Sequence, residues 1–227
     1  MKQAKKQLTI LALFSFIFLG PVRAQEQAEA ILDQVRSAQP RLDQPLSGQL
    51  RKDNGETIPL RMFFRGPELQ IQFINPSETL NLERTESGVS LTDQNGSVRQ
   101  SITGAKLTRQ VRGTDISYED LALSFLYWQN AKLVGEGVVR AITCSIIDVH
   151  PSSRDTEYGS VRLWIAKNRG ALVKAEGFDW QGRLIKRFEI VSAQEIQGKT
   201  VFKQIRIERL NPQDGKVLSR TYLEVQP

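Results

Sequence analysis

The sequence predicts a mainly β protein (α+β) built on one large, curved antiparallel sheet. Most of the chain alternates between apolar and polar residues, and turn signals recur about every eight to twelve residues. The turns are too short for the crossovers that parallel strands need, so neighbouring strands are expected to be antiparallel. Two segments with helical spacing interrupt this pattern, at residues 25–39 and 113–128. We expect these two helices to cover the concave face of the sheet.

The first 24 residues have the features of a Sec-type signal peptide. A start with three lysines precedes an apolar run at residues 8–19, and Val22 and Ala24 provide the small residues of a cleavage site. The apolar run is shorter than the roughly twenty residues of a membrane span, so an uncleaved anchor is the weaker alternative. The residue directly after the cleavage site is Gln25 and not a cysteine, so the lipobox of a lipidated protein is missing. We expect cleavage of residues 1–24 and one domain over residues 25–227.

Removal of this leader changes the charge balance. The whole chain has 31 basic and 25 acidic residues and a formal net charge of +6. Residues 1–24 hold four of the basic residues and no acidic one, which leaves 27 basic and 25 acidic residues, a net charge of +2. A charge so close to zero does not support binding to nucleic acid. Nucleic acid is therefore not an expected partner.

The first half of the domain predicts one helix and about six strands. Residues 25–39 place four apolar side chains on one helical stripe (Ala28, Ile31, Leu32 and Val35), and prolines at positions 40 and 45 end the helix. Hairpin signals such as Asn54-Gly55 and Asn95-Gly96 separate the strands, since both residues tolerate the positive φ of a tight turn. In two adjacent runs, one face carries only large apolar side chains: Leu60, Met62 and Phe64, then Leu69, Ile71 and Phe73.

Residues 113–128 form the longest helix-like apolar segment after the leader. Ser117 is followed three residues later by Asp120, a variant of the capping box that opens helices. The segment is apolar on nearly every side, and such a helix has to be covered on several faces. We expect a single helix enclosed by the sheet, with Asp115, Tyr118 and Asp120 bracing its entry loop. Acid–base catalysis by these carboxylates is the alternative, but capping and the helix dipole already account for them.

The second half repeats the strand pattern. Six strand-like runs lie at residues 137–149, 158–166, 171–178, 183–194, 200–210 and 217–225, and the last four of the five connections between them contain a glycine. The whole sheet would then have about eleven or twelve strands. Twist accumulates across so many strands, and the sheet has to curl or close.

No catalytic or metal-binding pattern is present in the sequence. Cys144 and His150 are the only cysteine and the only histidine, which makes a thiol–histidine pair or a zinc site improbable. No G-x-S-x-G nucleophile turn and no phosphate-binding glycine loop occur. Cys144 lies in an apolar run, where we expect a small buried side chain. We therefore expect no enzyme activity, no metal and no cofactor.

The block GTDISYEDL at residues 113–121 resembles the G-[ST]-D-[FI]-S-Y-E-D-L signature of the outer-membrane lipoprotein-sorting branch of the LolA/LolB superfamily. Weaker similarities are the cysteine strand that ends at His150-Pro151, the run around Trp164, and the turn near Gly182 and Lys186. The resemblance implies an incomplete β-barrel of about eleven strands with helices over its concave apolar side. It also implies a monomeric periplasmic carrier of lipid or of lipoprotein acyl chains. Its partners would include an inner-membrane exporter and an outer-membrane acceptor.

An acyl-chain cavity would lie between the sheet and the central helix. The predicted lining is Leu60, Met62, Phe64, Leu69, Ile71, Phe73, Leu121, Phe125, Leu126 and Trp128. An ordinary packed core gives the same alternation, so the resemblance, and not the periodicity, favours a cavity. The alternative is a non-enzymatic envelope scaffold with a packed core and no ligand cavity.

Overall fold

The computed structural model describes residues 20–38 and 40–226. Most of the predicted signal peptide, residues 1–19, lies outside the described residues. Helix α1 spans Gly20–Ser37, so it begins before the position at which we predict cleavage and continues through it. Cleavage after Ala24 stays a prediction. No helix in the described part of the chain is both long and apolar enough to cross a membrane.

The described residues form one antiparallel sheet of thirteen strands in the order β6-β5-β4-β3-β2-β1-β13-β12-β11-β10-β9-β8-β7, and the sheet does not close. The first six strands are β1 (Leu46–Lys52), β2 (Thr57–Arg65), β3 (Glu68–Phe73), β4 (Glu78–Arg84), β5 (Val89–Asn95) and β6 (Val98–Ser101). The other seven are β7 (Lys132–Val139), β8 (Ile142–Val149), β9 (Ser160–Ala166), β10 (Ala171–Phe178), β11 (Leu184–Ile196), β12 (Lys199–Leu210) and β13 (Val217–Gln226). The predicted fold class is confirmed, with thirteen strands instead of about eleven.

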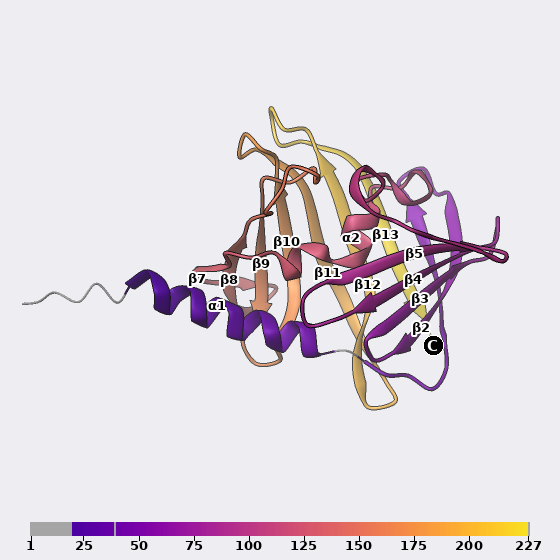
Figure 1. Cartoon of the computed structure of the whole chain (residues 1–227), viewed down its shortest axis with the longest axis horizontal. Coiled ribbons are helices and arrows are strands. Elements are labelled where there is room, and N and C mark those ends of the chain that lie inside the picture. Colours follow the sequence, from indigo (N-terminus) through magenta and orange to yellow (C-terminus); the bar gives the residue numbers. More distant parts are fainter. Residues whose placement is uncertain (1–19, 39, 227) are drawn as a thin grey trace, which may run out of the picture.

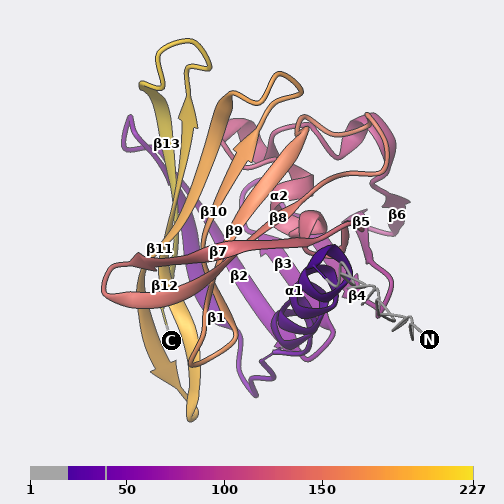
Figure 2. The same cartoon turned by 90° about the vertical axis from the view of Figure 1, so that its left-hand side faces the viewer.

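The two halves of the sheet meet where the first strand pairs with the last. Strand β1 lies between β2 and β13, and Leu50 faces Leu223 across the β1–β13 pair. Every other neighbouring pair consists of strands that follow one another in the chain. Figures 1 and 2 show the resulting curl, in which both halves bend around the segment that links them.

The extra strands come partly from a turn without a glycine. The run at residues 137–149, predicted as one strand, consists of part of β7 and all of β8. Between them, Arg140 and Ala141 have φ values of 47° and 65°, as the two central residues of a type I′ hairpin turn require. Neither residue favours positive φ, so the sequence carried no turn signal here. The prediction of one continuous strand is wrong.

The segment that links the halves is not the single helix that we predicted. It contains three 3₁₀ turns, η1 (Gly104–Lys106), η2 (Val111–Gly113) and η3 (Ser124–Tyr127), and one short helix, α2 (Tyr118–Ala122). Leu123 separates α2 from η3 because its backbone is left-handed, with φ 51° and ψ 40°. The predicted capping box at Ser117 and Asp120 is confirmed. We call residues 114–128, which cover the concave face, the lid.

The concave face carries two separate apolar clusters. One, which we call the cluster of β1–β5, gathers mainly side chains of these strands, with a few from β12 and β13 and with Ile116 and Ala122 of the lid. The other joins β8–β10 to Phe125 and Leu126 of the lid and to α1, whose Ala28 and Leu32 are fully buried. The period-two pattern explains both clusters: in β2, for example, alternate residues from Ile58 to Phe64 are buried. The lid thus packs on both halves of the sheet.

Candidate functional site

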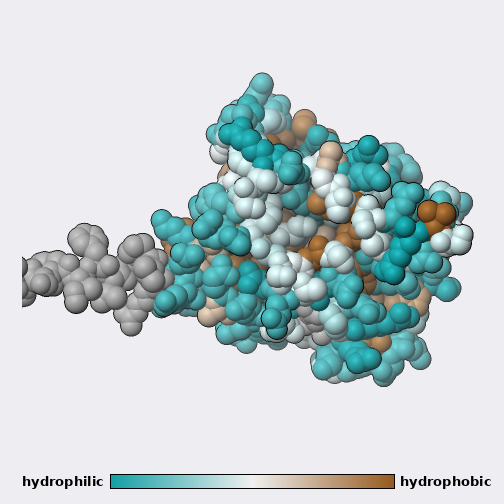
Figure 3. All heavy atoms as spheres, viewed as in Figure 1, coloured by the Kyte–Doolittle hydropathy of each residue, from teal (hydrophilic) through white to brown (hydrophobic). Residues whose placement is uncertain are grey.

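A cavity of about 240 Å³ lies between the concave face and the lid. Its wall is almost entirely apolar and draws on both halves of the sheet. The lining residues are Met62, Phe64, Leu69, Ile71, Arg84, Ile116, Asp120, Leu121, Leu123, Leu172, Val173, Lys174, Ala175, Phe188, Glu189, Ile190, Phe202, Ile205, Ile207 and Leu223. Figure 3 shows hydrophobic residues inside a hollow near the middle of this side of the molecule, surrounded by hydrophilic ones.

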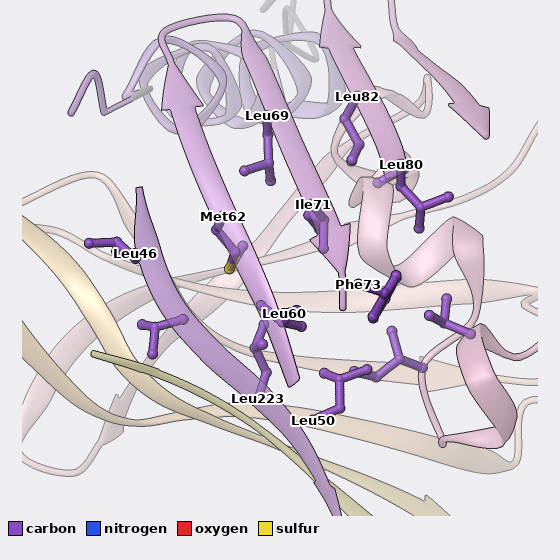
Figure 4. Packing of buried hydrophobic residues seen from close by; sticks show 14 of the residues in the cluster. Leu46, Leu50, Leu60, Met62, Leu69, Ile71, Phe73, Leu80, Leu82 and Leu223 are labelled. Carbon is purple, nitrogen blue, oxygen red and sulfur yellow. The ribbon is translucent and has the colours of Figure 1, made fainter. Parts of the chain in front are cut away.

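The structure divides the ten residues predicted to line a cavity into three groups. Met62, Phe64, Leu69, Ile71 and Leu121 line it. Leu60 and Phe73 do not line it, although they belong to the same cluster of β1–β5 as the four strand residues that do. Figure 4 shows side chains of this cluster pointing the same way from neighbouring strands. Phe125, Leu126 and Trp128 belong to the cluster under α1. Whether any of these residues contacts a ligand stays a prediction.

Sequence reasoning missed the half of the lining that comes from β10–β13. Phe188, Phe202, Ile205 and Leu223 all contribute to the wall. The period-two alternation of Ile205 with Ile207 was visible in the sequence, but Phe202 is three positions before Ile205 and reaches the same wall because the register between β11 and β12 shifts between them. Alternation indicates that a residue faces inward, but it does not identify what lies opposite, and the pairing of β1 with β13 carries no local signal.

Phe125 anchors the lid on the sheet. Its side chain is fully buried, with ring centroids 6.3 Å from Phe188 and 6.4 Å from Trp128. Trp128 in turn lies 6.4 Å from the ring of Tyr158. These separations are typical of favourable aromatic pairs, so this end of the lid is held by packing.

Asp115 fixes the loop before α2 to the last strand. Ser219 Oγ donates to Asp115 Oδ1 at 2.5 Å, and Thr221 Oγ1 donates to Asp115 Oδ2 at 2.9 Å. The backbone N–H of Asp115 also donates to Thr221 Oγ1 at 3.0 Å. Asp115 therefore has the contacts of a bracing residue, with its partners on β13.

Asp120 ties the start of α2 to the opposite half of the sheet. One carboxylate oxygen accepts from the Tyr158 hydroxyl at 2.6 Å, and the other accepts from Lys186 Nζ at 2.8 Å and from the Ser117 backbone N–H at 2.8 Å. Lys186 Nζ also contacts Glu157 Oε1 at 2.5 Å. Burial lowers the pKa of Lys186, but the two carboxylates outweigh it and hold the pKa above its ordinary value. The network keeps Lys186 charged inside the protein.

A glycine makes room for this network. A Cβ atom at Gly177 would lie 2.2 Å from the Tyr158 ring, which is far inside van der Waals contact. Tyr158 itself is fully buried, and burial, followed by the charge of Asp120, raises the pKa of its phenol well above the ordinary value. Tyr158 therefore acts as a neutral hydrogen-bond donor that positions Asp120.

Tyr118 and Glu119 occupy the first turn of α2. Tyr118 is half-buried and packs against the cluster of β1–β5, and burial raises the pKa of its phenol. Glu119 is buried and accepts from Thr156 Oγ1 at 2.7 Å. Burial raises the pKa of Glu119 from 4.5 to about 7, because the hydrogen bond from Thr156 offsets only part of the desolvation. The lid therefore contains a carboxyl group that titrates near neutral pH.

Replacing Glu119 by glutamine is expected to stabilise the protein at pH 8 and to change little at pH 4.5. Between pH 4.5 and about 7 the folded protein keeps a proton that the unfolded chain releases, so the contribution of Glu119 to stability falls as the pH rises. The difference amounts to at most about 3 kcal/mol. Urea unfolding of both proteins from pH 4.5 to 8 measures it, with the exposed Glu195→Gln as control. A gain that does not depend on pH would contradict the raised pKa.

Cys144 and His150, which the sequence makes improbable as a thiol–histidine pair or a zinc site, lie in ordinary surroundings. Cys144 is buried against Ala166 and Val173, and His150 is exposed after the end of β8. Across residues 20–38 and 40–226, no group of three or more histidine, cysteine, aspartate or glutamate side chains is arranged to hold a metal ion.

A family model described as "Uncharacterized protein"-like matches residues 96–226, more than half of the 227-residue chain. The chain belongs to this family. The matched residues run from the turn before β6 through the lid to β13, so they include all of the Asp115 and Asp120 contacts. No curated protein matches the sequence significantly.

Solved structures show that this chain has a LolA-like fold. A DUF1329 family protein from Desulfovibrio piger is 22% identical, with a TM-score of 0.66 and coverage of 91% of each chain. An outer membrane lipoprotein-sorting protein domain from Vibrio parahaemolyticus is 13% identical, with a TM-score of 0.71 and coverage of 89% of this chain and 92% of its own. A LolA superfamily protein from Nitrosomonas europaea is 16% identical, with a TM-score of 0.61 and coverage of 88% and 91%. The resemblance drawn from the sequence is confirmed for the fold.

Proposed function

We propose that the protein binds acyl chains of lipids or lipoproteins without covalent chemistry and carries them through the periplasm. The observation that supports this most is the apolar cavity between the lid and the concave face. Each methylene removed from water contributes about 0.8 kcal/mol, so a few buried methylenes already give measurable affinity. The name of the Vibrio protein, an outer membrane lipoprotein-sorting protein domain, points to the same class of cargo.

Part of the lid has to move before a whole acyl chain can enter the cavity. The cavity of about 240 Å³ is slightly smaller than the roughly 300 Å³ at which ligand pockets begin. Leu121 and Leu123 of the lid form part of its wall. The left-handed backbone of Leu123 already interrupts the helical conformation between α2 and η3. We propose that the side chains of Leu121 and Leu123 turn away from the cavity while the Asp120 contacts and Phe125 hold the lid on either side of them, so that the cavity lengthens.

The proposed route starts at the inner membrane. The leader at residues 1–24 supports export, and the carrier would accept cargo from an inner-membrane exporter and deliver it to an outer-membrane acceptor. It would work as a monomer and without a catalytic step. These partners form part of the proposal and have no residues assigned to them.

Native mass spectrometry with lipid extraction, on protein purified from the periplasm, tests the carrier proposal. We expect acyl-containing species bound one to one. Protein that carries no lipid and ignores added lipids would contradict the proposal and support the scaffold alternative. N-terminal sequencing of the same sample tests cleavage before Gln25.

Replacing Leu121 by glutamate is expected to weaken lipid binding at least about tenfold, since a charge in an apolar site costs a few kcal/mol. Leu121 lines the cavity and is only partly buried, so the fold should tolerate the change. Titration with a fluorescent fatty acid measures the affinity. The matched control is Leu218→Glu on β13, where the leucine is 60% exposed. Equal affinities of the two variants would contradict the placement of the lipid.

A further inference from the structure

One residue breaks the apolar pattern of the concave face. In β4, Leu80 and Leu82 are buried, and Arg84 follows at the next position on the same face. An arginine therefore stands where the alternation calls for an apolar side chain. Its side chain lines the cavity at the end of β4.

The other charged residues in the cavity wall have partners of opposite charge. Asp120 pairs with Lys186, Lys174 with Glu176, and Glu189 with Arg140 and Arg206. Among the described residues, Arg84 has no carboxylate partner and no side-chain hydrogen bond. Burial lowers the pKa of its guanidinium, and the small opposing influence comes from Tyr127, not from an acidic side chain. Arg84 thus brings an uncompensated positive charge to the wall.

The same arginine also reaches the outside. It borders a groove formed by the β4–β5 turn and the last turn of α1, together with Asp33, Arg36, Ser37, Thr85 and Glu86. Figure 1 shows this turn beside the end of α1. Nearby, the hydroxyl of Tyr127 is buried without a hydrogen-bond partner in the described structure, and Arg36 lies over the Tyr127 ring at 5.4 Å. The unpaired cation therefore stands where the apolar cavity meets a polar opening.

We propose that Arg84 binds the anionic group of an amphiphilic cargo whose acyl chain lies in the cavity. A guanidinium matches the geometry of a carboxylate or a phosphate, and its bond to such a group is strong when water is largely excluded. The preferred cargo is then a single-chain anionic lipid or a lipid with a phosphate near the chain. This inference rests on the proposed acyl-chain binding and adds the polarity of the ligand to it.

Competition binding at pH 8 tests the inference with three probes of equal chain length: laurate, dodecyl phosphate and dodecanol. The wild-type protein is expected to bind the two anions about 10- to 100-fold more tightly than the alcohol. Arg84→Met keeps the apolar stem of the side chain but removes the guanidinium, and it should reduce that preference to less than about threefold, with the affinity for dodecanol unchanged. Arg84→Lys should retain part of the preference, because the ammonium group keeps the positive charge but lacks the paired N–H donors of the guanidinium.

The control is Arg61→Met. Arg61 lies on the exposed face of β2, next to Met62 of the cavity wall, and should not affect any probe. If no probe binds, the proposed function fails. If all three bind alike, or if Arg84→Met keeps the preference, the inference fails and acyl-chain binding stands. Displacement of laurate by millimolar inorganic phosphate alone would assign a free-anion site and would also overturn the inference.

Discussion

Replacing Lys186 by methionine is expected to lower the free energy of unfolding by about 3–5 kcal/mol. The side chain is 6% exposed, and that of its partner Asp120 is 0% exposed. Methionine fills nearly the same volume but leaves Asp120 and Glu157 facing each other without the cation that neutralises both. Urea unfolding at pH 7, followed by tryptophan fluorescence, measures the loss.

Two comparisons make this test specific to the buried charge. Lys167→Met removes an exposed pair with Glu136 and should cost less than about 1 kcal/mol. Lys186→Met combined with Asp120→Asn should recover part of the loss, because it removes the uncompensated carboxylate as well. A double variant that is less stable by the full sum of the single losses would contradict direct coupling between Lys186 and Asp120.

Replacing Phe125 by alanine is expected to cost about 3–5 kcal/mol, the range for a fully buried aromatic side chain. Phe125 has no exposed surface and contacts the rings of Trp128 and Phe188. Loss of this anchor should also release the lid, so amide hydrogens of η3 should exchange with solvent much faster. Equilibrium unfolding and hydrogen exchange of the same variant measure both effects.

Leu121→Ala is the matched comparison within the lid. Leu121 already borders an empty space and is partly exposed, so its truncation should cost less than about half as much as that of Phe125. Similar losses at the two positions would mean that Leu121 is packed as tightly as Phe125 and would count against the cavity. The two variants therefore distinguish a residue of the cavity wall from a residue of the packed core, although the sequence predicted both as cavity lining.

Much of the fold could be predicted because its information is local. Asn54-Gly55 and Asn95-Gly96 mark turns by their chemistry; the first pair lies between β1 and β2, and in the second Asn95 ends β5 and Gly96 begins the turn to β6. The capping box at Ser117 likewise depends on residues three positions apart. The turn at Arg140-Ala141 and the break at Leu123 were missed because side chains that disfavour positive φ occupy them, and tertiary packing overrides that preference.

The candidate site was harder to predict because its contacts are distant in sequence. In the sequence, Lys186 is an ordinary lysine in a predicted strand. Its partner Asp120 lies 66 positions earlier in the chain, so no local pattern connects the two residues. Arg84 would be an ordinary strand end if the cavity did not reach it. Alternation gave the correct face for Met62 and Ile71, but Phe125 and Leu126 show that an inward-facing residue can belong to tight packing instead.

The position of β13 has a consequence for how the chain acquires its shape. Val217–Gln226 is the last strand of the described chain, yet it lies in the interior of the sheet between β1 and β12. The first half cannot join the second until these residues have been made, so the last strand completes the sheet. Contacts as distant as Leu50 with Leu223 also make folding slow. Until this strand is in place, β1 and β12 each have an unpaired edge, and such edges can pair with another chain.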